Sequence, residues 1–139
     1  LSNIPYYARD TVQFGAIPYN STAFNEWVDE ALAPPIPGSL KLYKGLVKLG
    51  FKIVFITGTH DTHTERRAEN LKNAGYTTWE KLILKGNGDG HDYKPNKRKE
   101  LEAAGYKIRG NMGDQWSDLL GSNPGDRTFK LPDPMYYIA

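Results

Sequence analysis

The sequence predicts an α/β fold of the Rossmann-like type, in which helices cover both faces of a parallel sheet. Three stretches of the chain share one design: an amphipathic helical pattern ends at a glycine and an aromatic residue, and a short apolar strand follows. The three junctions are Gly50-Phe51, Gly75-Tyr76 and Gly105-Tyr106. Glycine readily adopts the left-handed conformation that ends a helix, which explains its place at each junction. Helices that alternate with short buried strands indicate crossover units and therefore a parallel sheet.

Length and composition fit one folded domain and exclude several classes of protein. The chain has 139 residues, the length of a single domain, and contains 3 Trp, 9 Tyr and 5 Phe as large apolar groups. It has no cysteine, which excludes disulfide scaffolds, thiolate zinc sites and cysteine nucleophiles. A net charge of +2 is too balanced to indicate a nucleic-acid partner. Because no apolar stretch approaches the roughly 20 residues of a membrane helix, we expect no membrane partner either.

The first 37 residues differ from the rest of the chain. They are rich in aromatic residues, contain a predicted helix over 22–32 and end in the run Pro34-Pro35-Ile36-Pro37. We therefore expect one domain over 1–139, with a small cap-like segment over 1–37 and a core over 38–139. Four aromatic side chains of this segment either line a substrate entrance or cover one end of the sheet. They are Tyr6, Tyr7, Phe14 and Trp27.

The core elements follow in order along the chain. We expect a helix that ends at residue 49, a strand over 52–57, a helix over 62–74, a strand over 81–84, a helix over 95–104, a strand over 107–111 and a strand over 127–131. Thr62 and Glu65 form a capping-box pattern, and Pro95 suits a first helical turn. Pro132 ends the last strand.

Polar residues follow two of these strands, where ligands bind in open parallel sheets. Thr57-Gly58 follows the first apolar strand, and a Gly-Asp-x-x-x-Asp sequence follows the strand near residue 109. A helix that begins at Gln115 would place Asp114 and Asp118 on one side. Each aspartate could simply cap this helix. Alternatively, the pair could hold Mg²⁺, which takes one or two carboxylates near a phosphate group.

These residues resemble a known family. Thr57-Gly58, Lys94 and the run Gly113-Asp114-Gln115-Trp116-Ser117-Asp118 are similar to motifs two, three and four of the haloacid dehalogenase-like (HAD) phosphohydrolases. Three longer sequence segments resemble the plant class B acid phosphatases and vegetative storage proteins, and the resemblance covers essentially the whole chain. These segments are Ser2-Asn3-Ile4-Pro5-Tyr6-Tyr7, the run from Gly110 to Leu119 and the run from Phe129 to Tyr137.

The resemblance implies an acid phosphatase that hydrolyses small phosphate monoesters through an aspartyl-phosphate intermediate. It assigns phosphate binding to the Thr57 hydroxyl and the amide of Gly58. Lys94 would contact both the phosphate and the nucleophile, so Thr57 and Lys94 become the expected catalytic residues. Asp114 and Asp118 would complete a Mg²⁺ site.

The family's nucleophile motif, Asp-x-Asp-x-Thr, does not occur among the 139 residues. The resemblance places it immediately upstream of Leu1, on a central strand between the strands over 52–56 and 107–109. We therefore expect the 139-residue chain alone to be inactive and poorly folded. The alternative function is that of a vegetative storage protein, with the same fold and little or no catalytic activity. The residue at the first nucleophile position separates the two.

The resemblance also implies a vacuolar or secreted protein and allows a homodimer. The sequon Asn20-Ser21-Thr22 is a candidate glycosylation site in that setting.

Three local features qualify the expected site. Lys97 is an alternative to Lys94 as the motif lysine, and the basic run over 94–99 is expected to form a solvated helix face. Thr59 stands where relatives often carry a basic residue, which leaves the substrate-side contacts open. His60 and His63 have metal-ligand spacing but lack an evident third ligand.

Overall fold

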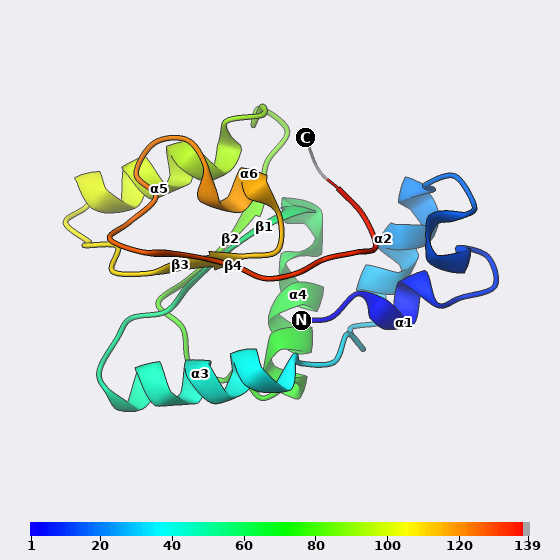
Figure 1. Ribbon diagram of the computed structural model, residues 1–139, viewed down its shortest axis with the longest axis horizontal. Coiled ribbons are helices and arrows are strands. Elements are labelled where there is room, and N and C mark those ends of the chain that lie inside the picture. The colour runs from blue at the N-terminus through cyan, green and yellow to red at the C-terminus, as the bar shows by residue number, and fades with distance from the viewer. Residues whose placement is uncertain (138–139) are drawn as a thin grey trace. The chain divides into compact units, whose positions relative to one another are not determined.

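The computed structural model describes residues 1–137 and confirms a mixed α/β fold with parallel strands (Figure 1). The chain divides into two compact units, one over residues 1–85 and one from residue 86 onward, and each is described by itself. The expected division into a cap-like segment over 1–37 and a core over 38–139 stays a prediction. No helix of the described residues is long and apolar enough to cross a membrane.

The first unit contains most of the helices and one two-stranded parallel sheet. Its elements are α1 (Ile4–Tyr7), η1 (Gln13–Gly15), α2 (Ser21–Asp29), α3 (Pro37–Lys48), β1 (Val54–His60), η2 (Asp61–His63), α4 (Thr64–Asn73) and β2 (Lys81–Lys85). Val54 pairs with Lys81, and the ladder continues in register to Thr57 and Leu84. The strand expected over 52–57 thus begins later and runs on to His60.

The core of the first unit is aromatic. Tyr43 of α3, Leu71 of α4 and Tyr76 are buried together, and Phe55 of β1 stacks on Tyr43 at a ring-centroid distance of 6.2 Å. The Tyr43 hydroxyl donates to the carbonyl of Thr78 at 2.5 Å, so the polar end of this buried ring is satisfied. This cluster therefore joins α3 and α4 to the β1–β2 sheet.

The N-terminal segment packs on itself and on α4. Tyr6 and Trp27 are both 2% exposed and contact Phe24, so these aromatic residues of α1 and α2 form an internal cluster. Asn70 of α4 accepts from the N–H of Ala33 and donates to its carbonyl. Phe14, in contrast, is 59% exposed.

Glycine ends the helices as expected, whereas one cap was predicted wrongly. Gly50, Gly75 and Gly105 have φ values of +85°, +94° and +91°, which confirms their left-handed conformation. Thr62 does not form a capping box with Glu65, because the first turn after β1 is the 3₁₀-helix η2 and the His60 side chain accepts from the N–H of Thr62.

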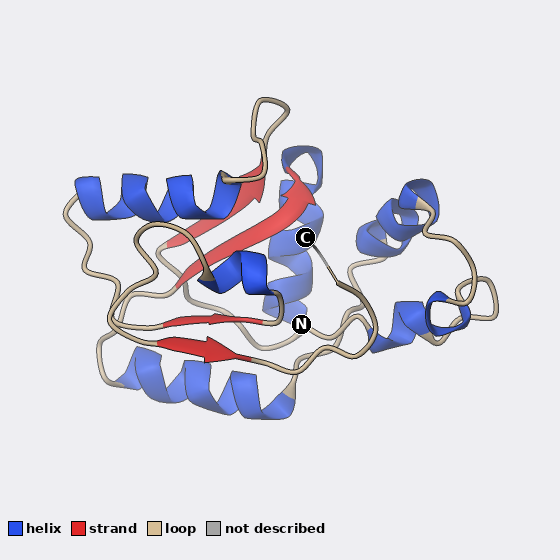
Figure 2. Ribbon diagram, turned by 45° about the horizontal axis from the view of Figure 1, so that its top comes forward, coloured by secondary structure: helices blue, strands red, loops and turns tan. Residues whose placement is uncertain are grey.

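The second unit contains the other two-stranded parallel sheet (Figure 2). Its elements are α5 (Tyr93–Ala103), β3 (Asn111–Gly113), α6 (Trp116–Leu119) and β4 (Thr128–Lys130). The strand expected over 107–111 is shorter and later, because the parallel partner Thr128 comes alongside only at Asn111. The helix expected from Gln115 is a single turn. It cannot continue, since Leu120 is extended and Gly121 has a φ of +82°.

Candidate active site

A β-bulge places the first candidate residues. The register of the β1–β2 ladder shifts between Thr57 and His60, so Gly58 and Thr59 bulge from the regular pairing. Gly58 is exposed, and a Cβ added to it would meet no atom within 4 Å. Backbone in such open space can be approached closely by a ligand.

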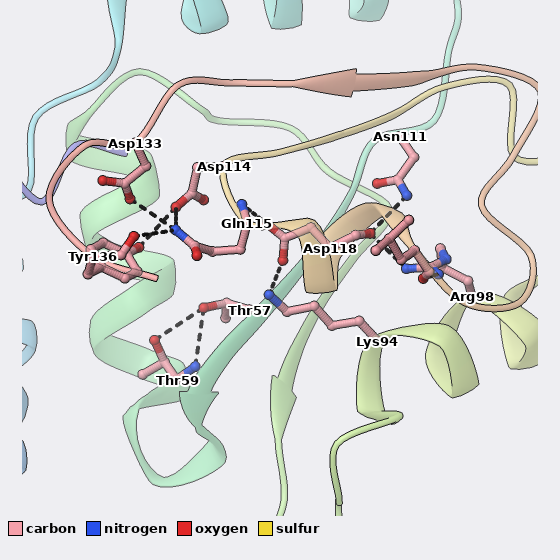
Figure 3. Close-up of polar contacts among 11 residues, drawn as sticks. Thr57, Thr59, Lys94, Arg98, Asn111, Asp114, Gln115, Asp118, Asp133 and Tyr136 are labelled. Carbon is pink, nitrogen blue, oxygen red and sulfur yellow. Dashed lines mark hydrogen bonds and ion pairs between the residues drawn. The ribbon is translucent and has the colours of Figure 1, made fainter. Parts of the chain in front are cut away.

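Hydrogen bonds fix the Thr57 side chain within the first unit. The N–H of Thr59 donates to Thr57 Oγ1 at 3.3 Å, and the two threonine hydroxyl oxygens lie 3.2 Å apart (Figure 3). Thr59 Oγ1 also accepts from Nε of Arg67, a residue of α4 that is only 8% exposed. Sequence reasoning missed Arg67. Its signal is the helical spacing that places it on the same buried face as Asn70 and Leu71.

The two histidines after Thr59 have local partners. His60 Nδ1 lies 3.0 Å from Thr62 Oγ1, and His63 Nδ1 lies 2.7 Å from Asp29 Oδ1. Among the described residues, no group of three or more His, Asp or Glu side chains could hold a metal ion. Each histidine thus has a side-chain partner, and among the described residues no third ligand joins them.

Lys94 and Asp118 meet within the second unit. Lys94 Nζ of α5 donates to Asp118 Oδ1, and the two side chains are 18% and 13% exposed (Figure 3). The other carboxylate oxygen of Asp118 accepts from the backbone N–H of Gln115 at 3.0 Å. Gly113 makes room for this arrangement, because a Cβ there would overlap the Asp118 side chain. Of the ion pairs among the described residues of this unit, the Lys94–Asp118 pair is the least exposed.

Lys97 has a different environment. Its Nζ pairs with Glu100 at 3.2 Å, three residues further along the same helix. Such a pair supports a helix surface and contributes little else. The geometry therefore favours Lys94 over Lys97 as the lysine of a site.

Arg98 corrects the expectation that the run over 94–99 is a solvated helix face. Arg98 is 3% exposed, and its guanidinium donates to four backbone carbonyls of the segment 118–123. They are Asp118, Leu120, Ser122 and Asn123. Burial lowers the pKa of Arg98, and Asp118 only partly opposes this. Arg98 lies three residues before buried Leu101, a spacing that could have identified it.

Asp114 has partners other than those of Asp118. Asp114 Oδ2 accepts from Gln115 Nε2 and from the Tyr136 hydroxyl, both at 3.0 Å. Gln115 is 3% exposed, and its Nε2 also lies 3.2 Å from Asp133 Oδ2. Asp133 and Tyr136 thus lie beside Gln115 and Asp114 (Figure 3). Sequence reasoning gave no role to Gln115, Asp133 or Tyr136 as individual side chains.

The pKa values of the two carboxyl groups in this cluster are shifted in opposite directions. Burial by itself would raise the pKa of Asp114, but hydrogen bonds from Gln115, Asp133 and Tyr136 outweigh burial and hold that pKa below its ordinary value. Burial raises the pKa of Asp133, and the neighbouring Asp114 carboxylate adds to the rise. Burial and hydrogen bonding thus shift the pKa of Asp114 down and the pKa of Asp133 up.

The donor chemistry around Asp114 fits part of a Mg²⁺ site. Mg²⁺ is usually held by one or two carboxylates together with phosphate oxygens and water, so a full protein cage is not required. Asp114 offers an ionised carboxylate, whereas Asp118 already neutralises Lys94. The structure thus gives the two aspartates separate partners, and their joint metal role stays a prediction.

Asn20 lies in the first unit. It is exposed and forms the N-cap of α2, where its Oδ1 accepts from the N–H of Ala23 at 3.1 Å.

Comparison with known proteins gives the family. The family model described as HAD superfamily, subfamily IIIB (acid phosphatase), matches residues 1–139. The chain belongs to this family. It is 46% identical to acid phosphatase 1 of Solanum lycopersicum over 142 residues, which cover 99% of the chain and 55% of that protein. It is 52% identical to a stem 28 kDa glycoprotein of Glycine max, covering 99% of the chain and 56% of that protein.

Other relatives extend the comparison. Vegetative storage protein 1 of Arabidopsis thaliana is 41% identical, over 99% of the chain and 52% of that protein. The structure of a class C acid phosphatase from Bacillus anthracis shares the fold, with a TM-score of 0.79 at 23% identity, over 99% of the chain and 63% of that structure. The chain thus spans about half the length of these curated relatives, and the family includes both acid phosphatases and storage proteins.

Proposed function

We propose that this chain supplies the phosphate- and metal-binding residues of an acid phosphatase that hydrolyses small phosphate monoesters. The observation that carries the proposal is the partly buried Lys94–Asp118 pair beside an ionised Asp114. Burying charge is costly, and a storage role alone gives no reason to hold a lysine and two aspartates in this environment. Strong environmental effects on ionisable groups are typical of functional sites.

Each residue would have a defined task. Thr57 and the amide of Gly58 would donate to phosphate oxygens, and the Lys94 ammonium would balance their negative charge. Asp118 would hold Lys94 in place. Asp114 and Asp118 would together complete the Mg²⁺ site. When bound, Mg²⁺ neutralises charge on the transferring phosphoryl group.

The chemical step needs a nucleophile that these residues do not provide. We propose a carboxylate from the first Asp of an Asp-x-Asp-x-Thr motif in the full-length natural protein, which would attack phosphorus and form an aspartyl-phosphate as the P–O bond to the leaving group breaks. The second Asp of that motif, as a general acid, would give the leaving oxygen the proton with which it departs as an alcohol. Water would then release phosphate and regenerate the carboxylate. We also propose that the protein is a vacuolar or secreted plant protein, because its relatives are named stem glycoproteins and vegetative storage proteins.

A storage protein with the same fold is the second candidate, because relatives at 41% and 39% identity carry that name. It predicts a folded protein that releases no phosphate from p-nitrophenyl phosphate at any Mg²⁺ concentration. An acid phosphatase releases phosphate under the same conditions.

Asp114→Asn tests the enzyme proposal in the full-length protein. The change keeps the shape of the side chain but removes its charge, so we expect Mg²⁺-dependent hydrolysis of p-nitrophenyl phosphate to fall by about a hundredfold or more. Asp126→Asn is the matched control, because Asp126 is a half-exposed aspartate of the same unit that pairs with Arg109. Unchanged turnover in Asp114→Asn would remove Asp114 from the site.

A further inference from the structure

We propose that Arg67 and Thr59 are positioning residues that turn the hydroxyl proton of Thr57 toward a phosphate oxygen. The inference rests on the proposed function, in which Thr57 binds phosphate. It adds a chain of hydrogen bonds that starts on α4, crosses the bulge of β1 and ends at the Thr57 hydroxyl.

The contacts form a continuous chain within the first unit. Nε of Arg67 donates to Thr59 Oγ1 at 3.1 Å, and this oxygen lies 3.2 Å from Thr57 Oγ1. The backbone N–H of Thr59 donates to the same Thr57 oxygen at 3.3 Å. Figure 3 shows both contacts between the two threonines. Thr59 is therefore joined to Thr57 twice.

The direction of the chain follows from the chemistry of arginine. A guanidinium only donates hydrogen bonds, so Thr59 Oγ1 must be the acceptor of its contact with Arg67. The positive charge beside this oxygen makes it a poorer acceptor and makes its own O–H a better donor. The Thr59 hydroxyl therefore donates to Thr57 Oγ1 in preference to the reverse arrangement.

This direction determines what Thr57 can do. Its oxygen accepts both from the hydroxyl and from the N–H of Thr59, which uses both of its lone pairs. The Thr57 proton then has to find an acceptor outside this pair. An anionic phosphate oxygen is a strong one, since hydrogen bonds to charged acceptors are shorter and stronger than neutral ones.

Burial of Arg67 supports a fixed geometry. Arg67 is 8% exposed, whereas the neighbouring Arg66 is exposed and pairs with Glu69 three residues on. Removing a guanidinium from water costs free energy, and hydrogen bonds from its N–H groups are needed to offset that cost. The bulge that removes Gly58 and Thr59 from regular pairing lets the Thr59 side chain reach both partners.

Thr59→Val is the main test, because it removes one hydroxyl and keeps the shape of the side chain. The readout is the affinity of the full-length protein for inorganic phosphate, measured by titration calorimetry, which does not depend on turnover. We expect Thr59→Val to weaken binding about tenfold, and Thr59→Ser, which keeps the hydroxyl, to stay within about twofold of the natural protein. Equal affinities of the valine variant and the natural protein would overturn the proposal.

A double-mutant cycle separates positioning from a direct contact or a general structural effect. If Thr59 acts through Thr57, then Thr57→Val combined with Thr59→Val should bind phosphate no more weakly than Thr57→Val alone. Additive losses would contradict the relay. If Thr57→Val itself leaves the affinity unchanged, Thr57 is not a phosphate ligand and this part of the proposed function fails instead.

Arg67→Met extends the same test, with Arg66→Met as its matched control. We expect Arg67→Met to weaken phosphate binding to the same extent as Thr59→Val, with no further loss when the two are combined. Arg66→Met should leave the affinity unchanged, and equal effects of the two arginine variants would overturn the role of Arg67. Should Arg67→Met fail to fold, the cycle between Thr57 and Thr59 decides the proposal.

Discussion

At the scale of single residues, Gly113 is a glycine with very little room for a side chain. A Cβ there would lie 2.7 Å from Asp118 Cγ and closer still to other atoms of that side chain. Gly113→Ala must therefore displace Asp118 from Lys94 or move the loop. Overpacking of this kind costs about 1–3 kcal/mol, so we expect a lower free energy of unfolding in urea together with a loss of phosphatase activity.

Gly110→Ala is the control for this prediction. A Cβ on Gly110 would meet only Phe129 Cε2 at 3.5 Å, an ordinary contact distance. This variant should keep both stability and activity. If Gly113→Ala behaves in the same way, the close approach of Asp118 to Gly113 does not govern the ion pair.

Asn20 offers a second prediction at this scale. Its Oδ1 caps α2, whereas a glycan would be attached through Nδ2, so the cap and the modification are compatible. We expect the protein produced through a plant secretory pathway to carry a glycan at Asn20, detected by mass spectrometry. Thr22→Ala should abolish the glycan because it destroys the sequon, whereas Thr22→Ser preserves it. A protein that remains unmodified at Asn20 would contradict the prediction.

At the scale of elements, the segment after β4 makes the environment of Asp114 sensitive to pH. The pKa of Asp133 is raised, so its stabilising contribution is present at low pH and is lost as the pH rises through the raised value. The pKa of Asp114 is lowered, so its contribution is present above the ordinary value and is lost as the pH falls through the lowered one. The pair is therefore most stabilising at pH values between the lowered pKa of Asp114 and the raised pKa of Asp133.

Asp133→Asn separates the two contributions. An asparagine amide can donate to Asp114 at every pH, so we expect this variant to lose less stability than the natural protein as the pH rises from acidic to neutral. The measurement is the free energy of urea unfolding of the full-length protein at a series of pH values. Asp126→Asn, on the exposed pair with Arg109, is the control. Parallel profiles for the natural protein and Asp133→Asn would contradict the assignment.

Elements were predicted better than their polar contacts, for a physical reason. Helix ends at Gly50, Gly75 and Gly105 depend on local backbone preference, which the sequence displays directly. The burial of Arg67 and Arg98 depends on carbonyl and hydroxyl partners from other segments of the same unit. Helical spacing could have placed both arginines on buried faces, but it could not have named their partners.

The candidate site shows the same limit. The motif resemblances named Thr57, Asp114 and Asp118 as candidates, because each lies in a short run of specific residues, and they named Lys94 from its place before a helix. They did not indicate that Asp118 pairs with Lys94 while Asp114 turns to Gln115 and Tyr136. The single turn of α6 is too short for helical spacing to fix where the two carboxylates point.

At the scale of the whole molecule, the described residues form two separate two-stranded parallel sheets, β1–β2 and β3–β4. A two-stranded sheet is marginally stable by itself, and each of its strands leaves one edge of N–H and C=O groups without a ladder partner. The 139 residues also contain no Asp-x-Asp-x-Thr motif. The 139 residues thus hold no nucleophile of the proposed kind, and the described residues 1–137 add no third strand to either sheet.

We therefore expect the 139-residue chain, produced alone, to release no phosphate from p-nitrophenyl phosphate and to unfold over a broad range of urea concentration. Its aromatic core around Tyr43 should retain compactness without a sharp transition, since each sheet of the described residues has only two strands. The full-length natural protein, under the same conditions, should unfold cooperatively. Circular dichroism during urea titration and a phosphate-release assay on both proteins make the comparison. A sharp transition together with phosphate release from the 139-residue chain would show that these residues need neither a further strand nor an aspartyl nucleophile of that motif.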